Sequence, residues 1–287
     1  MTTLPIAPDP GVRERPGVRP VGRTPGRADG RADGRAPVSA EDLRIAGIVP
    51  LSTVDWPGKL AATVFCQGCP WRCTYCHNTA ILDATAPGTA SFADLEALLA
   101  RRRGLLDAVV FSGGEATMQH ALIPAAQRVR EAGFAVGLHT GGAFPTRLSG
   151  LLGITADGRR VAAPLVDWVG FDVKAAPTGY DDLVGRANAW ERAHRSLEML
   201  LASGVEHELR MTVTPALLDQ VTQVVGAVSR AGGRALVLQQ ARPDGAAEDF
   251  AAQLTALKDW PARFAEVAEQ ACTAGERCGV EVSARAG

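Results

Sequence analysis

The chain has 287 residues, of which 46% are hydrophobic, and a formal net charge of −1 at pH 7. This length allows one large core or two modest ones, and the near-zero charge argues against electrostatic attraction to nucleic acid or to a membrane surface. No apolar run reaches the roughly 20 residues of a membrane span, and the first residues lack the apolar stretch of a secretory signal. We therefore expect a cytoplasmic protein with no nucleic-acid partner and no membrane partner.

Residues 1–40 differ in composition from the rest of the chain. They are rich in Pro and Gly, contain seven Arg and no aromatic residue, and include a short repeat at 26–36. Such a segment buries too little apolar surface to offset the entropy of ordering it. A basic arm for nucleic acid or a transit peptide is the alternative, but four acidic residues offset the Arg side chains and amphipathic helical spacing is missing. We predict a disordered tail over 1–40 and one domain over 41–287.

From residue 61 onward, predicted strands alternate with predicted amphipathic helices. The periodicity predicts strands at 61–66, 107–111, 134–139, 166–173, 206–213 and 234–239. It predicts helices at 92–103, 119–132, 188–202 and 216–231, more helix up to residue 275, and a last short strand at 279–283. Alternating units of this kind imply an α/β fold with a parallel sheet and outer helices. Six main strands predict a partial (β/α)6 barrel rather than a closed eight-stranded one.

Residues that could bind a ligand or take part in catalysis lie at or near the ends of all six predicted strands. Ligands bind at the carboxyl ends of parallel strands, so these residues are expected on one rim. In chain order they are a cysteine-rich loop, the turn Ser112-Gly113-Gly114-Glu115, the run His139-Thr140-Gly141-Gly142, the segment Asp172-Val173-Lys174, Arg210, and the pair Gln239-Gln240. This arrangement predicts a functional site on that rim.

Four cysteines lie within eleven residues of the loop after the first predicted strand: Cys66, Cys69, Cys73 and Cys76. The inner three have the spacing C-x3-C-x2-C. Three thiolates can hold three irons of a [4Fe–4S] cluster and leave the fourth iron open to a small molecule. An electron-transfer ferredoxin closes all four irons with cysteine. The spacing therefore favours a cluster that performs chemistry.

Structural zinc and a plain electron-transfer cluster are the alternatives for this loop. Zinc-binding Cys pairs are normally well separated, whereas the two pairs here are only four residues apart. The bacterial ferredoxin run C-x2-C-x2-C-x3-C-P does not match. Cys66 ends an apolar strand and is expected to fill the core rather than to bind iron. Cys272 and Cys278 have no nearby thiol partners in the sequence, and we interpret them as structural.

The loop spacing with aromatic Tyr75, together with the Gly113-Gly114-Glu115 turn, resembles the radical S-adenosylmethionine (SAM) superfamily. Further motifs resemble the activating enzymes of glycyl-radical proteins, and among these the activating proteins of anaerobic ribonucleoside-triphosphate reductases. These motifs are Ser52-Thr53-Val54-Asp55-Trp56-Pro57-Gly58-Lys59, Gln67-Gly68-Cys69 and Tyr75-Cys76-His77-Asn78. The resemblance covers roughly residues 45–240.

The resemblance implies two cofactors, a [4Fe–4S] cluster and S-adenosyl-L-methionine. Cys69, Cys73 and Cys76 would bind the cluster, whose open iron would chelate the amino and carboxylate groups of S-adenosylmethionine. One electron, supplied by a flavodoxin or ferredoxin, would then release methionine and a 5′-deoxyadenosyl radical. The protein would supply position, electrostatics and exclusion of water.

The resemblance also implies roles for the residues of the other strand ends. Gly113, Gly114 and Glu115 would bind the methionyl amino group, and Tyr75 would lie near the adenine. Thr140 would contact ribose or methionine. The alternatives are an ordinary tight turn for the two glycines and simple packing for Tyr75.

Three charged residues complete the implied site. Lys174 would pair with the methionyl carboxylate, Asp172 would contact ribose, a cation or the partner's loop, and Arg210 would lie near the carboxylate or adenine. The alternatives are an exposed ion pair for Asp172 with Lys174 and a salt bridge for Arg210. The chain departs from the family pattern at two positions: Ala116 stands where Pro is common, and His139 stands where an acidic residue is common.

The expected function is therefore that of a radical SAM oxidoreductase that generates a glycyl radical on a partner enzyme, the anaerobic ribonucleotide reductase. The activator of pyruvate formate-lyase, or a radical SAM enzyme with a small-molecule substrate such as one in deazapurine synthesis, is the nearest alternative. A non-catalytic iron–sulfur or zinc binding module is the alternative of a different class. Iron content and cleavage of S-adenosylmethionine would separate that module from an enzyme.

Overall fold

The computed structural model describes residues 37–286. The disordered tail predicted over 1–40 lies outside the described residues up to residue 36 and stays a prediction. The first element is a short 3-10 helix, η1 (Ala40–Asp42). In the part of the chain that is described, no helix is both long and apolar enough to cross a membrane.

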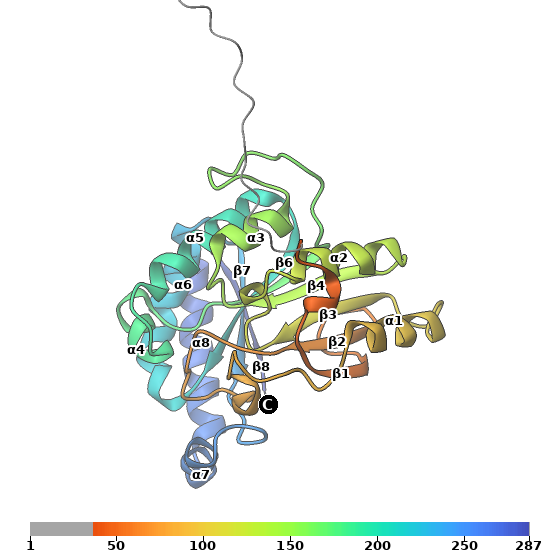
Figure 1. The fold of residues 1–287 in the computed structure, drawn as a ribbon. Coiled ribbons are helices and arrows are strands. Elements are labelled where there is room, and N and C mark those ends of the chain that lie inside the picture. Colours follow the sequence, from red (N-terminus) through yellow and green to blue (C-terminus); the bar gives the residue numbers. More distant parts are fainter. Residues whose placement is uncertain (1–36, 287) are drawn as a thin grey trace, which may run out of the picture. The chain divides into compact units, whose positions relative to one another are not determined.

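An eight-stranded sheet in which the strands follow their sequence order forms the centre of the fold (Figure 1). β1 (Ile45–Ser52) is antiparallel to β2 (Ala61–Cys66), and every later neighbour pair is parallel. The remaining strands are β3 (Ala108–Gly113), β4 (Ala135–Thr140), β5 (Trp168–Asp172), β6 (Glu206–Val213), β7 (Ala235–Gln240) and β8 (Glu281–Arg285). Within residues 37–286, β1 and β8 are the two edges of the sheet. The barrel is therefore open, and the predicted partial α/β barrel is confirmed.

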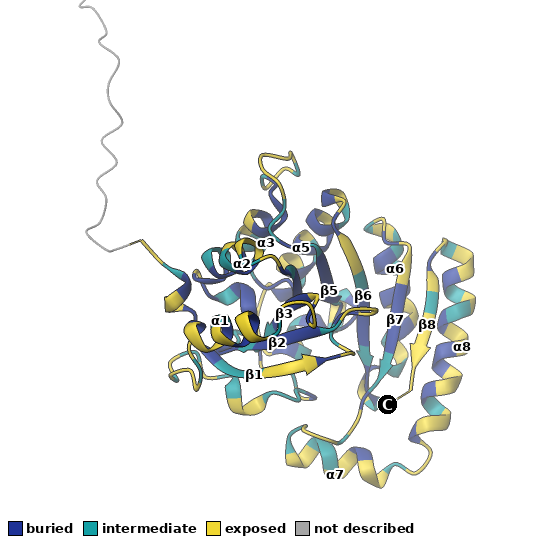
Figure 2. Ribbon diagram, turned by 90° about the vertical axis from the view of Figure 1, so that its right-hand side faces the viewer, coloured by how far each residue is buried: buried dark blue, intermediate teal, exposed yellow. Residues whose placement is uncertain are grey.

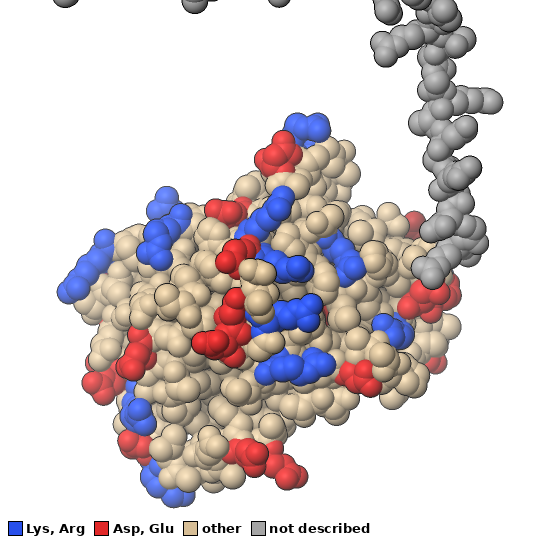
Figure 3. Space-filling model, turned by 60° about the vertical axis from the view of Figure 1, so that its left-hand side comes forward, with Lys and Arg blue, Asp and Glu red and all other residues tan. Residues whose placement is uncertain are grey.

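Helices follow the parallel strands and cover the outer face of the sheet (Figure 1). They are α1 (Phe92–Arg101), α2 (Leu122–Glu131), α3 (Pro145–Leu152), α4 (Tyr180–Val184), α5 (Ala189–Ser203), α6 (Val221–Arg230), α7 (Glu248–Ala256) and α8 (Trp260–Cys278). Short 3-10 turns are η2 (Thr79–Ile81), η3 (Ala116–Met118), η4 (Pro177–Gly179) and η5 (Pro215–Gln220). Figure 3 shows basic and acidic side chains interspersed on one face of the molecule, in keeping with the net charge of −1.

The start of α1 illustrates how local sequence sets an element. The Ser91 hydroxyl accepts a hydrogen bond from the Asp94 backbone N–H, and the Asp94 carboxylate accepts one from the Ser91 backbone N–H at 2.8 Å. Such a capping box stabilises a helix by about 1 kcal/mol. The helix then buries Leu95, Leu98 and Leu99 on one face, as the sequence periodicity predicts.

The two faces of the sheet carry different residues, because alternate strand positions point to opposite sides. One face joins the helices in a large apolar core, to which β2 contributes Ala62, Val64 and Cys66. The concave face begins at the amino ends of the strands with a second apolar cluster of Trp56, Ala61, Ala108, Val110 and Trp168. Polar residues follow toward the carboxyl ends on the same face, namely Ser112, His139, Asp172 and Arg210. The functional site is built where this polar half meets the cysteine loop.

Several elements differ from the sequence prediction. β1 was not predicted, because it is only partly buried (Figure 2), contains Pro50 and lacks strict alternation of apolar residues. The helix predicted at 216–231 begins as η5, with Pro215 in its first turn, and becomes α-helical only at Val221. The last predicted strand is present as β8, shifted by two residues.

Candidate active site

One cavity of about 220 Å³ opens among the carboxyl ends of the parallel strands. It is lined by every residue that the sequence singled out for cluster or cofactor binding: Cys69, Cys73, Cys76, Tyr75, Gly113, Gly114, Glu115, Thr140, Asp172, Lys174 and Arg210. Cys66 does not line it; its side chain is fully buried in the main apolar core. The sequence prediction therefore brings together residues that are up to 141 positions apart.

Backbone hydrogen bonds hold the cysteine loop in place. Gly68 and Cys69 donate from their N–H groups to carbonyls around η2, at 2.8 and 3.2 Å, and Arg72 donates to the Val184 carbonyl at the end of α4 at 2.9 Å. Gly68 has a φ of +94°, which a residue with a side chain rarely adopts. The loop is therefore shaped by glycine and by contacts on both flanks.

The Gly113-Gly114 turn packs directly on the backbone of the cysteine loop. The Gly114 N–H donates to the Cys66 carbonyl at 3.0 Å, and the Glu115 N–H donates to the Gly68 carbonyl at 2.9 Å. A Cβ at Gly114 would lie 2.3 Å from the Gly68 carbonyl oxygen, and one at Gly113 would lie 2.3 Å from the Cys66 nitrogen. The two glycines are needed because the backbones approach too closely for any side chain.

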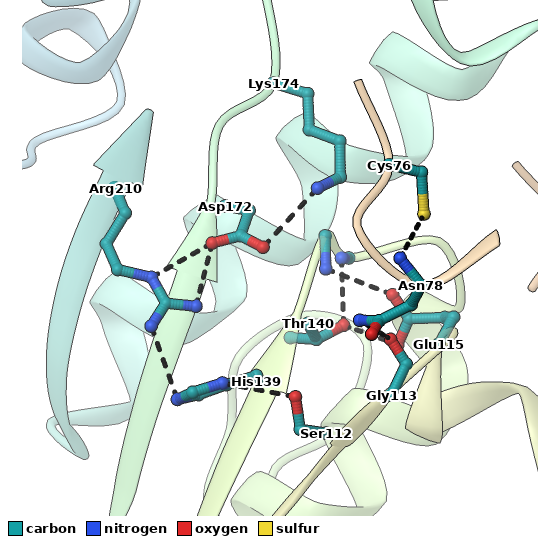
Figure 4. Close-up of polar contacts among 12 residues, drawn as sticks. Cys76, Asn78, Ser112, Gly113, Glu115, His139, Thr140, Asp172, Lys174 and Arg210 are labelled. Carbon is teal, nitrogen blue, oxygen red and sulfur yellow. Dashed lines mark hydrogen bonds and ion pairs between the residues drawn. The ribbon is translucent and has the colours of Figure 1, made fainter. Parts of the chain in front are cut away.

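The Glu115 carboxylate is 2% exposed and is satisfied within the protein. It accepts hydrogen bonds from the Thr140 hydroxyl at 2.7 Å (Figure 4) and the Gly141 N–H at 3.0 Å. It also accepts hydrogen bonds from the Thr117 hydroxyl at 2.5 Å and the Thr117 N–H at 3.2 Å. Burial raises the pKa of this carboxyl, while the four hydrogen bonds oppose that shift. Glu115 thus ties the end of β3 to the end of β4 and positions both.

Three charged side chains form the opposite wall of the cavity. Asp172 Oδ1 accepts hydrogen bonds from Arg210 Nε at 3.0 Å and Nη2 at 2.8 Å, and Asp172 Oδ2 lies 3.4 Å from Lys174 Nζ (Figure 4). Burial alone would raise the pKa of Asp172, but the two cations outweigh it and hold the pKa well below its usual range. Burial lowers the pKa of Lys174, but Tyr75, Asp172 and Cys73 together raise it by more. The pKa of Lys174 therefore lies well above its usual value. One anion between two cations leaves a net positive charge facing the cysteines.

His139 lies beneath this charged wall, with its side chain directed at the segment before β2. Its Nε2 lies 2.6 Å from the Asp55 carbonyl oxygen and 3.3 Å from Arg210 Nη1, and its Nδ1 lies 3.3 Å from the Ser112 hydroxyl. Burial and the neighbouring Arg210 guanidinium lower the pKa of His139 to about 4. The imidazole is therefore neutral at pH 7.

Acid should destabilise the protein through His139. The unfolded chain binds this proton near pH 6.5 and the folded chain only near pH 4, so the stabilisation is complete above pH 6.5 and is lost as the pH falls toward 4. We expect a loss of about 2 kcal/mol by pH 5, measured by urea unfolding of wild type at a series of pH values. His139→Gln serves as the control, because it keeps all other titrating groups. Equal pH slopes for the two proteins would contradict the prediction.

Sequence reasoning missed the supporting roles of Asn78 and Trp71. The Asn78 N–H donates to Cys76 Sγ at 3.3 Å, and its side-chain amide donates to the Gly113 carbonyl at 3.3 Å. The Trp71 ring packs so closely on Gly141 that a Cβ there would lie 2.2 Å from the ring. The glycine at position 141, directly after Thr140, was the one sign in the sequence that another group packs closely there. Gln239 and Gln240 lie outside the cavity and line an adjoining pocket.

The donor set of the cavity suits a cluster better than a single metal ion. Among residues 37–286, no three His, Cys, Asp or Glu side chains are close enough together to hold one ion. Three cysteines instead surround a shared space, as ligands of three different irons would. Burial and the Glu115 carboxylate raise the pKa of the Cys69 thiol to about 12, and a bound metal would displace that proton.

The sequence pattern that defines the radical SAM superfamily matches residues 63–224. This range is more than half of the chain and includes all of the strands from β3 to β6. The chain belongs to the radical SAM superfamily. This superfamily uses a [4Fe–4S] cluster and S-adenosylmethionine. The three cysteines that line the cavity are suitable ligands for such a cluster.

Curated relatives of this radical SAM protein include activating enzymes. A putative glycyl-radical enzyme activating enzyme of Methanocaldococcus jannaschii is 33% identical over 184 residues, which are 61% of this chain and 70% of that protein. One of Haemophilus influenzae is 33% identical over 116 residues, 38% of this chain and 42% of that protein. The pyruvate formate-lyase-activating enzyme of Clostridium pasteurianum is 34% identical over 104 residues, 34% of this chain and 43% of that protein.

Two solved structures illustrate the shared fold. A radical SAM methyltransferase from Sphaerobacter thermophilus has a TM-score of 0.55 at 17% identity, over 80% of this chain and 67% of that one. Streptococcus suis SuiB bound to S-adenosylmethionine has a TM-score of 0.53 at 12% identity, over 76% of this chain and 48% of that one. At these identities the likeness concerns the fold alone.

Proposed function

We propose that the chain is a radical SAM activating enzyme that cleaves S-adenosylmethionine reductively and generates a glycyl radical on an anaerobic ribonucleoside-triphosphate reductase. The observation that carries the proposal is the single cavity in which three cysteines face a net positive wall. The names of the relatives support the activating type. The oxidoreductase class, a cytoplasmic location and a flavodoxin or ferredoxin as electron donor are parts of the same proposal.

Cys69, Cys73 and Cys76 are the proposed cluster ligands. The position of the Cys66 side chain in the core rather than in the cavity supports three ligands rather than four. When bound, the two cofactors supply a carbon-centred radical that can take a hydrogen atom from an unactivated C–H bond. The protein's part is to bind, orient and exclude water.

The charged wall is the proposed site for the methionyl carboxylate. Lys174 makes one contact with Asp172, at 3.4 Å, so its ammonium retains donors for a ligand. Arg210 is held by Asp172 through two hydrogen bonds and adds positive charge without having to move. We propose that Asp172 also reaches a ribose hydroxyl.

The opposite wall is the proposed site for the remaining parts of S-adenosylmethionine. Backbone carbonyl groups of Gly113 and Gly114 suit an ammonium. The Glu115 carboxylate is occupied by hydrogen bonds from Thr140 and Gly141 and positions the strand ends rather than serving as the main contact. Tyr75, which is 5% exposed, is proposed to lie beside the adenine, and Thr140 is proposed to contact the ribose or the methionine.

Replacing Lys174 with Met should weaken binding of S-adenosylmethionine roughly 10- to 100-fold, because a charge-assisted hydrogen bond to the carboxylate is lost. The measurement is anaerobic equilibrium dialysis of the cluster-containing protein, with iron content checked in the same samples. Lys258→Met, at an exposed position, is the matched control and should bind as wild type does. An unchanged Kd for the Lys174 variant would place the carboxylate elsewhere.

The proposed function is tested by electron paramagnetic resonance. Reduced, cluster-containing protein is mixed anaerobically with S-adenosylmethionine and the anaerobic reductase from the same source. A glycyl-radical doublet on the reductase is the expected result. If 5′-deoxyadenosine forms without a doublet, the partner is wrong, and pyruvate formate-lyase is the next to test because one relative activates it. If neither forms with an intact cluster, the enzyme proposal fails.

A further inference from the structure

The segment between β1 and β2 folds into the concave face of the sheet. Trp56, which is 6% exposed, stacks on Trp168 of β5 with ring centroids 5.5 Å apart and an interplanar angle of 16°. The ring also lies against Gly137 of β4, where a Cβ would be 2.9 Å from Trp56 Cε3. The Asp55 carboxylate accepts a hydrogen bond from the Thr63 hydroxyl at 2.6 Å. The turn formed by residues 53–56 is thus held against β2, β4 and β5 by the side chains of Asp55 and Trp56.

His139 is the contact between this turn and the cysteine-lined cavity. Its Nε2 lies 2.6 Å from the Asp55 carbonyl oxygen, which can only accept, so Nε2 must carry the proton. Nδ1 then accepts from the Ser112 hydroxyl at 3.3 Å. Arg210 Nη1, 3.3 Å from Nε2, cannot donate to a protonated nitrogen and remains held through the Asp172 contacts (Figure 4). The rings of His139 and Trp168 make an edge-type contact, with their centroids 5.6 Å apart.

The turn also borders a second pocket of about 360 Å³. That pocket shares His77 and Thr212 with the cysteine-lined cavity, so the two spaces are neighbours. Val54, whose side chain is 80% exposed, lines the second pocket, while His139 lines the first. The turn 53–56 therefore reaches the second pocket through Val54 and contacts the lining of the first cavity through the Asp55 carbonyl and His139.

We propose that His139 is a positioning residue that fastens the turn 53–56 to the floor of the cysteine-lined cavity through the Nε2–H to Asp55 carbonyl hydrogen bond, and so keeps the cavity closed toward the second pocket. Releasing the turn opens a path for water from the second pocket to the site of radical chemistry. The proposal goes beyond the proposed function, which it needs only for the activity measurement described below.

Two substitutions separate this hydrogen bond from the rest of the His139 environment. The side-chain nitrogen of Gln reaches about as far as Nε2 of His, and that of Asn reaches about as far as Nδ1. His139→Gln therefore keeps a donor for the Asp55 carbonyl, whereas His139→Asn keeps only the contact with Ser112. Amide hydrogen exchange of the peptide covering residues 53–60 is measured in the cluster-containing protein, without any partner.

Exchange in the turn should become roughly tenfold faster in His139→Asn and stay close to wild type in His139→Gln. Unchanged exchange in both variants would overturn the proposal. Equal acceleration in both would also overturn it, because ring packing rather than the hydrogen bond would then hold the turn.

The activity measurement is the ratio of 5′-deoxyadenosine to glycyl radical in the reaction with the reductase. The ratio should rise in His139→Asn and be restored in His139→Gln; a ratio equal to wild type in His139→Asn would contradict the sealing role. If wild type itself forms no glycyl radical, the proposed function fails. The hydrogen-exchange result then still decides whether His139 holds the turn.

Discussion

Replacing Cys73 with Ala should abolish cluster assembly and all cleavage of S-adenosylmethionine, whereas replacing Cys66 with Ala should preserve both. Cys73 lines the cavity, and its loss leaves two thiolates for a cluster that needs three. Cys66 lies wholly within the apolar core, so its truncation costs only the packing of one small side chain, about 1 kcal/mol. Iron and sulfide per chain, and 5′-deoxyadenosine formed under reducing conditions, measure the two effects.

The Cys66 variant tests most directly how many cysteines bind the cluster. A cluster lost from Cys66→Ala, with the fold retained by circular dichroism, would contradict the assignment of three ligands. It would make Cys66 a fourth ligand and turn the centre into one that only carries electrons. Cys69→Ala and Cys76→Ala should behave as Cys73→Ala does, since all three side chains line the same cavity.

Gly114→Ala should disrupt the site as severely as loss of a cysteine, although it changes no functional group. The added Cβ would lie 2.3 Å from the Gly68 carbonyl oxygen and 3.2 Å from Cys69 Cβ. Backbone cannot move aside as a flexible side chain can, so the turn and the cysteine loop must separate. We expect a loss of about 1–3 kcal/mol in unfolding free energy, with poor cluster retention and undetectable binding of S-adenosylmethionine.

The matched control for this prediction is Gly47→Ala in β1. A Cβ at Gly47 meets nothing within 4 Å, and its backbone does not have a positive φ. That variant should keep the stability, the cluster content and the binding of wild type. If Gly114→Ala were equally harmless, the close contact between the turn and the cysteine loop would not exist in solution.

Much of the site could be predicted because its determinants are local in sequence. The C-x3-C-x2-C spacing, the double glycine and the Asp172-x-Lys174 segment each lie within a few residues at the end of one strand. A parallel sheet then brings strand ends to one rim whatever the details of packing. Strand β2 (Ala61–Cys66) has the bounds that its pattern predicts, because buried strands carry the strongest pattern.

What the sequence could not provide are contacts between distant residues. The full set of partners of Glu115 joins three segments, and the hydrogen bond of His139 reaches a carbonyl 84 residues away. A backbone carbonyl leaves no signature in the sequence, so neither role could be inferred from residue type. β1 escaped prediction for a different reason. Its pairing with β2 is irregular between Val49 and Ser52, and such irregularities break the alternation of apolar and polar residues by which a strand is recognised.

The open sheet has a consequence for the behaviour of the protein at high concentration. Exposed strand edges invite pairing with strands of other molecules, a route to aggregation that closed barrels avoid. Both edges of the described sheet carry features that oppose such pairing. Pro50 lies in the irregular part of β1, and β8 carries Glu281 and Arg285, the latter tied to Glu208 by hydrogen bonds of 3.0 and 2.5 Å. Proline cannot donate to a neighbouring strand, and desolvating an ion pair is costly. The barrel can therefore stay open at one side without that opening becoming a template for fibril growth.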